Sequence, residues 1–137
     1  MLKSYSVVNL YMAKFVEMDE KVTLKDQMQE NETRSVILIN KFNVVPEQIE
    51  QFLNAWTEDA TNFKEQPGFI STQLHKGIGK STVFVNYAVW ESLKHFKNAV
   101  DKVLGPDPQS LLNKYPKSLV VSPHLFKKVS VPGICGD

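Results

Sequence analysis

The stretch Val83–Phe96 decides the fold, and it reads Val-Phe-Val-Asn-Tyr-Ala-Val-Trp-Glu-Ser-Leu-Lys-His-Phe. Its first eight residues are β-branched, aromatic or small, apart from Asn86, which is typical of a strand with apolar residues on both faces. Ser92 is a favourable helix N-cap, and apolar residues then recur at helical spacing through Val103. The sequence therefore predicts a strand that leads almost directly into an amphipathic helix, with one amide in the buried strand.

Upstream of this stretch, the sequence predicts another strand and another helix. Ser35–Phe42 is a strand by its β-branched content, and Asn40 shares one of its faces with apolar side chains. Pro46 suits the first turn of a helix, and a single broad apolar stripe follows it. That helix is expected to end before Gln66-Pro67-Gly68, a breaker sequence.

Two further strands complete the expected fold. Phe69–Lys76 alternates as a half-buried strand and is expected to form a hairpin with Val83–Trp90. Leu119–Val121 and His124–Val129 supply the last strand, which is expected to be interrupted at Pro123. That position predicts an edge or a bulge, because proline donates no ladder hydrogen bond. The order strand, helix, strand, strand, helix, strand predicts an α+β ferredoxin-like fold with an antiparallel four-stranded sheet.

The expected domain organisation has three parts: residues 1–34 as an N-terminal extension, residues 35–129 as the domain, and residues 130–137 as a tail. Within the extension, Ser6–Met12 fits either a helix or a strand, and the polar stretch Asp19–Arg34 is interpreted as a linker. Two helices cover only one face of a four-stranded sheet. The other face would expose apolar residues, so a homodimer joined sheet to sheet, a dimeric α+β barrel, is expected.

Composition excludes several classes of partner. The chain has 137 residues, 16 basic against 15 acidic, and Arg34 is its sole arginine, so nucleic acid and membrane surfaces are not expected as partners. Cys135 is the only cysteine, which excludes an intrachain disulfide. The three histidines lack metal-ligand spacing, so no metal is expected. Met1–Phe15 is too polar for a secretory signal, and a cytoplasmic location is the default.

The polar residues in the strands have two interpretations. Asn40 and Asn86 either line a ligand pocket or are satisfied by neighbouring groups, as most buried amides are. Trp56 is a core residue by its place on the apolar stripe, although its indole N–H requires a partner. His95 lies beside the stripe of the second helix, where it either lines a cavity mouth or covers the edge of the core.

Four motifs resemble the antibiotic biosynthesis monooxygenase family over about Ser35–Phe126. They are Ile39-Asn40-Lys-Phe, Phe52-Leu-Asn-Ala-Trp56, Gln66-Pro-Gly-Phe69 and Val89-Trp-Glu-Ser92. The resemblance implies a dimeric α+β barrel with a cavity between sheet and helices, and an oxidation of electron-rich phenols, quinols or polyketides by dioxygen without metal, flavin or haem. It also implies that Asn40 and Trp56 are the catalytic residues that position a phenolate-like substrate.

The substrate pocket is expected to include further residues from the same elements. They are Phe42, Phe52, Asn86, His95 and Phe96. The haem-degrading branch of the fold has a Trp where Ala99 stands here and a His near Gln109, so the resemblance disfavours haem degradation. Two functions stay open: a cofactor-free monooxygenase, and a non-enzymatic small-molecule-binding or structural dimer of the same fold.

Overall fold

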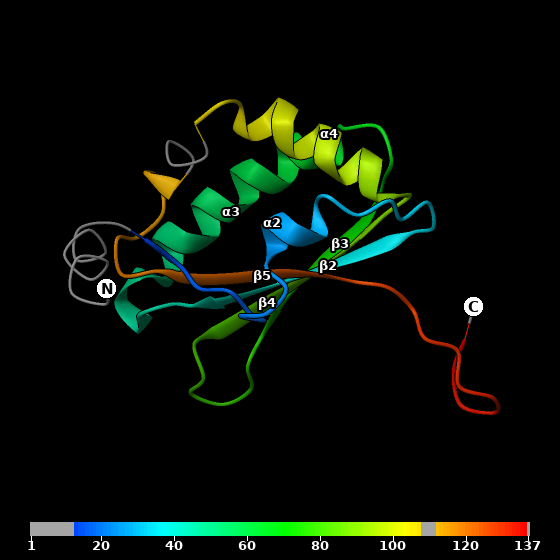
Figure 1. The fold of residues 1–137 in the computed structure, drawn as a ribbon. Coiled ribbons are helices and arrows are strands. Elements are labelled where there is room, and N and C mark those ends of the chain that lie inside the picture. Colours follow the sequence, from blue (N-terminus) through cyan, green and yellow to red (C-terminus); the bar gives the residue numbers. More distant parts are fainter. Residues whose placement is uncertain (1–12, 108–111, 137) are drawn as a thin grey trace.

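The computed structural model describes residues 13–107 and 112–136. Figure 1 shows one twisted sheet with α3 and α4 packed across one side and the short α2 beside them. In chain order the elements are β1 (Lys14–Phe15), α2 (Leu24–Gln27), β2 (Val36–Asn43), the 3₁₀ turn η1 (Pro46–Gln48), α3 (Ile49–Lys64), β3 (Phe69–Lys76), β4 (Val83–Trp90), α4 (Leu93–Leu104) and β5 (Val120–Phe126). The strands and helices predicted from residue 35 onward are confirmed.

The expected four-stranded antiparallel sheet needs a correction, because the sheet has five strands and is mixed. Its order is β1-β5-β2-β4-β3, and the last four strands are the antiparallel ferredoxin-like set. The added strand β1 runs parallel to β5. Two backbone hydrogen bonds of 2.8 Å hold it there, from Lys14 N to Leu119 O and from Val16 N to Val121 O. Such a long-range pairing leaves no local signature in a two-residue strand.

The stretch interpreted as a linker contains α2, which is docked on the domain. A capping box begins it: Asp26 N donates to Thr23 Oγ1, and Thr23 N donates to Asp26 Oδ2. The Gln27 amide then pairs with the backbone of Leu125, donating to its oxygen (2.8 Å) and accepting from its nitrogen (2.9 Å). Gln27 thus satisfies part of the free edge of β5. The stretch Ser6–Met12 lies outside the described residues.

Pro123 fits the edge that the sequence predicts. The backbone atoms of Val121 and Leu125 that face away from β2 bond to β1 and to Gln27 respectively. Pro123 lies between them, and the alternation of an antiparallel strand turns its nitrogen to the same outer side. Its missing N–H therefore costs no hydrogen bond to β2.

Two of the recognised motifs meet at one joint of the fold. Glu91 N donates to Gly68 O (2.8 Å), and the rings of Phe69 and Trp90 lie edge to face with their centroids 5.5 Å apart. Gly68 has a φ of 88°, and a Cβ there would lie 2.3 Å from the His95 ring. Only glycine allows the first turn of α4 to approach so closely. These two motifs therefore have structural roles in the fold.

The buried apolar residues form two clusters at opposite ends of the helix-covered face. The Phe52 cluster consists of Ala13, Phe42, Val44, Phe52, Ala55, Phe84, Tyr115, Leu119 and Val121. The Trp90 cluster consists of Val36, Ala88, Trp90, Leu93, Phe96, Ala99 and Leu125, with Leu24 and Met28 of the N-terminal segment packed against it. The core is thus divided, and the residues between its two halves are those of interest for function.

Candidate functional site: a cavity between the two core clusters

A row of residues crosses the sheet between the two clusters. Pro123 pairs with Asn40, Asn40 pairs with Asn86, and Asn86 pairs with Leu74 across neighbouring strands. We call these four residues the amide row. Pro123, Asn40 and Asn86 lie two positions along their strands from residues of both ends, because side chains on one face of a strand repeat every second residue. Leu74 is itself packed against the Phe52 cluster. The amide row thus marks the middle of the helix-covered face.

A cavity of about 270 Å³ lies over this row. Its floor includes Asn40 and Asn86, and its roof includes Trp56 and Phe63 of α3 and Val100 of α4. Most of its lining is apolar, with few polar groups. A largely apolar cavity with a small number of convergent polar groups is the usual form of a small-molecule site.

The two amides of the floor differ in how they are satisfied. Thr72 Oγ1 donates to Asn86 Oδ1 at 2.5 Å, which fixes the orientation of that amide. Asn40 Oδ1 is buried and has no hydrogen-bond partner among the described residues. A buried acceptor without a partner costs about 1–3 kcal/mol. The cavity is therefore the place from which a ligand would supply the missing donor.

The roof carries a buried carboxylate, Asp59, which is 8% exposed and lines the cavity. Tyr115 Oη donates to Asp59 Oδ2 at 2.6 Å, and Lys114 Nζ lies 2.5 Å from Asp59 Oδ1. Burial raises the pKa of Asp59, although the hydrogen bonds from Lys114 and Tyr115 act in the opposite direction. Burial and the adjacent carboxylate also raise the pKa of Tyr115, so its hydroxyl stays protonated at ordinary pH.

The N-terminal segment closes one side of the cavity. Phe15 of β1, Leu24 of α2 and Met28 line it together with the domain. The Gln27 amide, bonded to the Leu125 backbone, anchors this wall to β5. The extension is therefore part of the candidate site.

The structure brings most of the residues predicted for the site to this cavity. Asn40, Trp56, Phe42, Asn86 and Phe96 line it. Phe52 does not: it is fully buried between the rings of Phe42, Phe84 and Tyr115. Phe52 lies on the same side of α3 as Trp56 but one turn earlier, where it packs into the Phe52 cluster.

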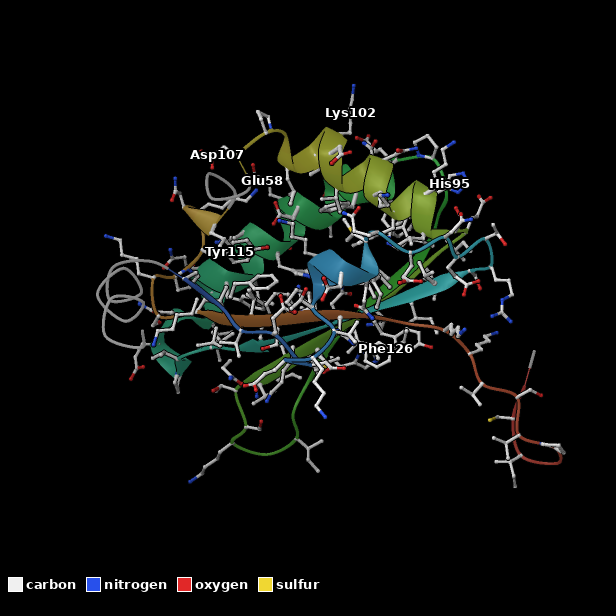
Figure 2. The ribbon with its side chains drawn as sticks, in the orientation of Figure 1. Glu58, His95, Lys102, Asp107, Tyr115 and Phe126 are labelled. Carbon is white, nitrogen blue, oxygen red and sulfur yellow. The ribbon has the colours of Figure 1, made fainter. Side chains whose placement is uncertain are left out.

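His95 also lies away from the cavity. Ser92 Oγ accepts from His95 N and lies 2.8 Å from His95 Nδ1, so the ring folds back on the helix N-cap and against Gly68. Figure 2 shows His95 and Tyr115 near opposite ends of the helical layer. The position of His95 is that of a residue covering the edge of the core, one of its two predicted roles.

Sequence reasoning missed Asp59 and Tyr115. A signal for Asp59 was present, because it follows Trp56 by three residues and therefore shares its helix face. A carboxylate on an otherwise apolar stripe is unusual enough to mark a site. Tyr115 had no such signal, since its approach to Asp59 depends on how the chain returns from α4 to β5.

Other kinds of site find little support in the described part of the chain. No group of three or more His, Cys, Asp or Glu side chains in residues 13–107 and 112–136 is placed to hold a metal ion. Ala99, near which the resemblance to the haem-degrading branch would place a Trp, is buried in the Trp90 cluster, and Gln109 lies outside the described residues. None of the described helices is both long and apolar enough to span a bilayer.

Solved structures similar to this chain share its fold. A candidate monooxygenase from Shewanella loihica PV-4 is 29% identical with a TM-score of 0.60, covering 74% of this chain and 100% of its own. SnoaB, a cofactor-independent oxygenase from Streptomyces nogalater, is 24% identical with a TM-score of 0.59 over 73% and 98%. A heme-degrading protein from Mycobacterium tuberculosis is 18% identical with a TM-score of 0.51 over 72% and 99%. The last two likenesses establish the fold alone.

Sequence comparison assigns the family. No curated protein sequence matches the chain. The sequence profile of the antibiotic biosynthesis monooxygenase family matches residues 35–102, which span β2 to most of α4 and include Asn40, Trp56 and Asn86. The extension that closes the cavity lies outside this match. Residues 35–102 are therefore a domain of the antibiotic biosynthesis monooxygenase family.

Proposed function

We propose that this protein is a cofactor-independent monooxygenase that oxidises a small electron-rich aromatic compound, a phenol or quinol, with dioxygen. The observation that carries the proposal is the buried Asn40 amide on the floor of an apolar cavity, whose Oδ1 has no partner within residues 13–107 and 112–136. Family membership and the fold shared with SnoaB, a cofactor-independent oxygenase, support it.

The volume of the cavity limits the size of the substrate. An apolar cavity of about 150 Å³ holds one benzene ring, and the cavity here is about 270 Å³. A two-ring aromatic such as a naphthol or naphthoquinol fits this space. Trp56 and Phe96 would contact its ring faces or edges.

The amide row would act on the oxygen substituent of the substrate. Asn86, oriented by Thr72, and Asn40 lie side by side, so both reach a ring laid across the row. The donors would be the NH₂ groups of Asn40 and Asn86, since the amide oxygens only accept hydrogen bonds. Donors aimed at an oxygen that becomes negatively charged stabilise that charge strongly where water is excluded. The phenolate would then supply the electrons that reduce dioxygen, a task that flavins or metals perform in other oxygenases.

Dioxygen uptake tests this proposal. Purified protein without added cofactor should consume dioxygen with a naphthoquinol, and Asn40→Ala should lower the enzymatic rate roughly 100- to 1,000-fold, as single oxyanion-donor deletions do. Asn43→Ala, an exposed amide on the same strand, is the matched control and should leave the rate unchanged. If a panel of two-ring phenols and quinols binds but none is oxidised, the alternative of a non-enzymatic ligand-binding dimer is preferred.

We also propose that two copies pair through the sheet face opposite the helices. Phe126 lies on that side of the sheet (Figure 2). Alternation places Ile39 and Tyr87 there too, with Tyr87 41% and Phe126 38% exposed. The same face carries polar side chains such as Lys41 and Ser122. Exposed apolar side chains grouped on one sheet face are typical of an interface. Light scattering at micromolar concentration should give twice the 15.6 kDa chain mass; a stable monomer would contradict the pairing.

A further inference from the structure

The roof of the cavity holds a pair of groups that the proposed function has not used. Both carboxylate oxygens of Asp59 are engaged, Oδ2 by the Tyr115 hydroxyl and Oδ1 by Lys114 Nζ. The Tyr115 hydroxyl donates its proton to Asp59, and its oxygen keeps lone pairs that accept hydrogen bonds. Both side chains line the cavity. A ligand hydroxyl in the cavity would therefore meet a hydrogen-bond acceptor backed by a buried carboxylate.

We propose that the Asp59–Tyr115 pair accepts the proton of a neutral phenolic substrate, a step that rests on the proposed function. The substrate O–H bond breaks and its proton passes to Tyr115 Oη, while the Tyr115 proton passes to Asp59 Oδ2. The products are a bound phenolate, an unchanged tyrosine and a protonated Asp59. No electrons move in this step, and Asp59 later returns its proton to water.

The surrounding charges favour a substrate that arrives neutral. Lys114 is the cation at Asp59, and Glu58 Oε1 lies 3.6 Å from the same Nζ. One positive and two negative groups leave an excess negative charge at the roof, and the floor amides are neutral. A phenolate formed in solution would be repelled. The raised pKa of Asp59 makes it a stronger proton acceptor than an exposed carboxylate.

A purely structural role would have different consequences. Tyr115 belongs to the Phe52 cluster, so its bond to Asp59 also ties the chain before β5 to α3. That tie would contribute to stability whatever ligand is present. It would not make the affinity for a phenol depend on the ionisation state of that phenol, which is the property to measure.

Binding of 4-nitrophenol without dioxygen measures this property independently of turnover. The neutral and ionised forms of this probe absorb differently, so titrations on either side of its pKa give both affinities. Wild-type protein should bind the neutral form at least roughly tenfold more tightly, by the Coulomb argument above. Asp59→Asn keeps an acceptor for Tyr115 and should abolish this preference. Glu65→Gln, an exposed carboxylate at the C-terminal end of α3 that does not contact Lys114, is the control and should retain it.

Each outcome of the titration decides something. An unchanged preference in Asp59→Asn would overturn the proposal, because the pair would not contact the phenol hydroxyl. Absence of any phenol binding to wild-type protein would reject the proposed function as well. If Asp59→Asn loses the preference for neutral over ionised 4-nitrophenol but still binds the neutral form as tightly, the result supports contact between the Asp59–Tyr115 pair and the phenol hydroxyl.

The pH dependence of turnover completes the test. The turnover rate of the Asp59→Asn variant should be low below the pKa of the substrate. It should then rise about tenfold per pH unit as the substrate ionises in solution. Tyr115→Phe, which keeps the ring in its cluster, should also be slow at low pH, but its rate should recover less because Asp59 still repels the phenolate. A rate deficit of constant size at every pH would overturn the proton-accepting role.

Discussion

The ends and the middle of the helix-covered face are filled differently. At the two ends, side chains of the Phe52 and Trp90 clusters pack ring against ring. In the middle, Asn40 and Asn86 of the amide row put short polar side chains where the pattern of the strands would allow large apolar ones, and both line the cavity. The difference indicates that the ends hold the fold and that the middle is shaped for a ligand at some expense of stability.

The largest expected effect of a substitution is at a closed end. Phe52 is fully buried against three rings, so Phe52→Ala should lower the free energy of unfolding by about 3–5 kcal/mol. Urea denaturation measures this change. Leu53→Ala, a half-exposed neighbour on the same helix, is the control and should cost far less. A small loss of unfolding free energy in Phe52→Ala would mean that the Phe52 cluster does not hold this end of the fold.

A smaller effect is expected where the extension closes the cavity. Gln27→Ala removes two hydrogen bonds to the Leu125 backbone and should cost roughly 1–3 kcal/mol. Lys25→Ala, an exposed position on α2, is the matched control. Hydrogen exchange at Leu125 should increase in Gln27→Ala alone. Unaltered exchange there would show that the segment does not hold the edge of β5.

The smallest effect concerns the roof carboxylate and its pH dependence. Burial raises the pKa of Asp59 above the ordinary value of 3.8, so the folded chain binds this proton more tightly than the unfolded chain. By linkage, its contribution to stability falls as the pH rises from the ordinary pKa through the raised one. Asp59→Asn removes this dependence. The unfolding free energy of the variant minus that of wild type should therefore increase between pH 4 and neutrality, and a decrease would contradict the raised pKa.

The sequence allowed the elements from residue 35 onward to be predicted because each carries its own periodicity and stop signal. Val83–Trp90 and Ser92 are examples. It did not allow β1 or α2 to be predicted. The pairing of Lys14 with Val120 is set by tertiary structure, and a four-residue helix has too few residues to show a period.

The site was also predictable in part, because the two-residue period of a strand shows which side chains share a face. Asn40 and Asn86 were visible as amides within apolar strands, and alternation fixed the face on which they lie. The part of a helix that faces a cavity depends on how that helix packs. Phe52 and Asp59 show this, because both lie on the inner side of α3 but only Asp59 reaches the cavity.

The central claim is that the amide row is kept for a ligand and not for the fold. Replacing Asn40 by Leu, which branches at the same carbon but carries no polar atom, tests it most directly, with unfolding free energy and 4-nitrophenol affinity measured on the same variant. Since Asn40 Oδ1 has no partner in the described part of the chain, Asn40→Leu should raise stability by roughly 1 kcal/mol and weaken phenol binding. Asn86→Leu, which strands the Thr72 hydroxyl, should instead lower stability by roughly 1–3 kcal/mol. A loss of stability in Asn40→Leu as large as in Asn86→Leu, with phenol binding intact, would contradict the account.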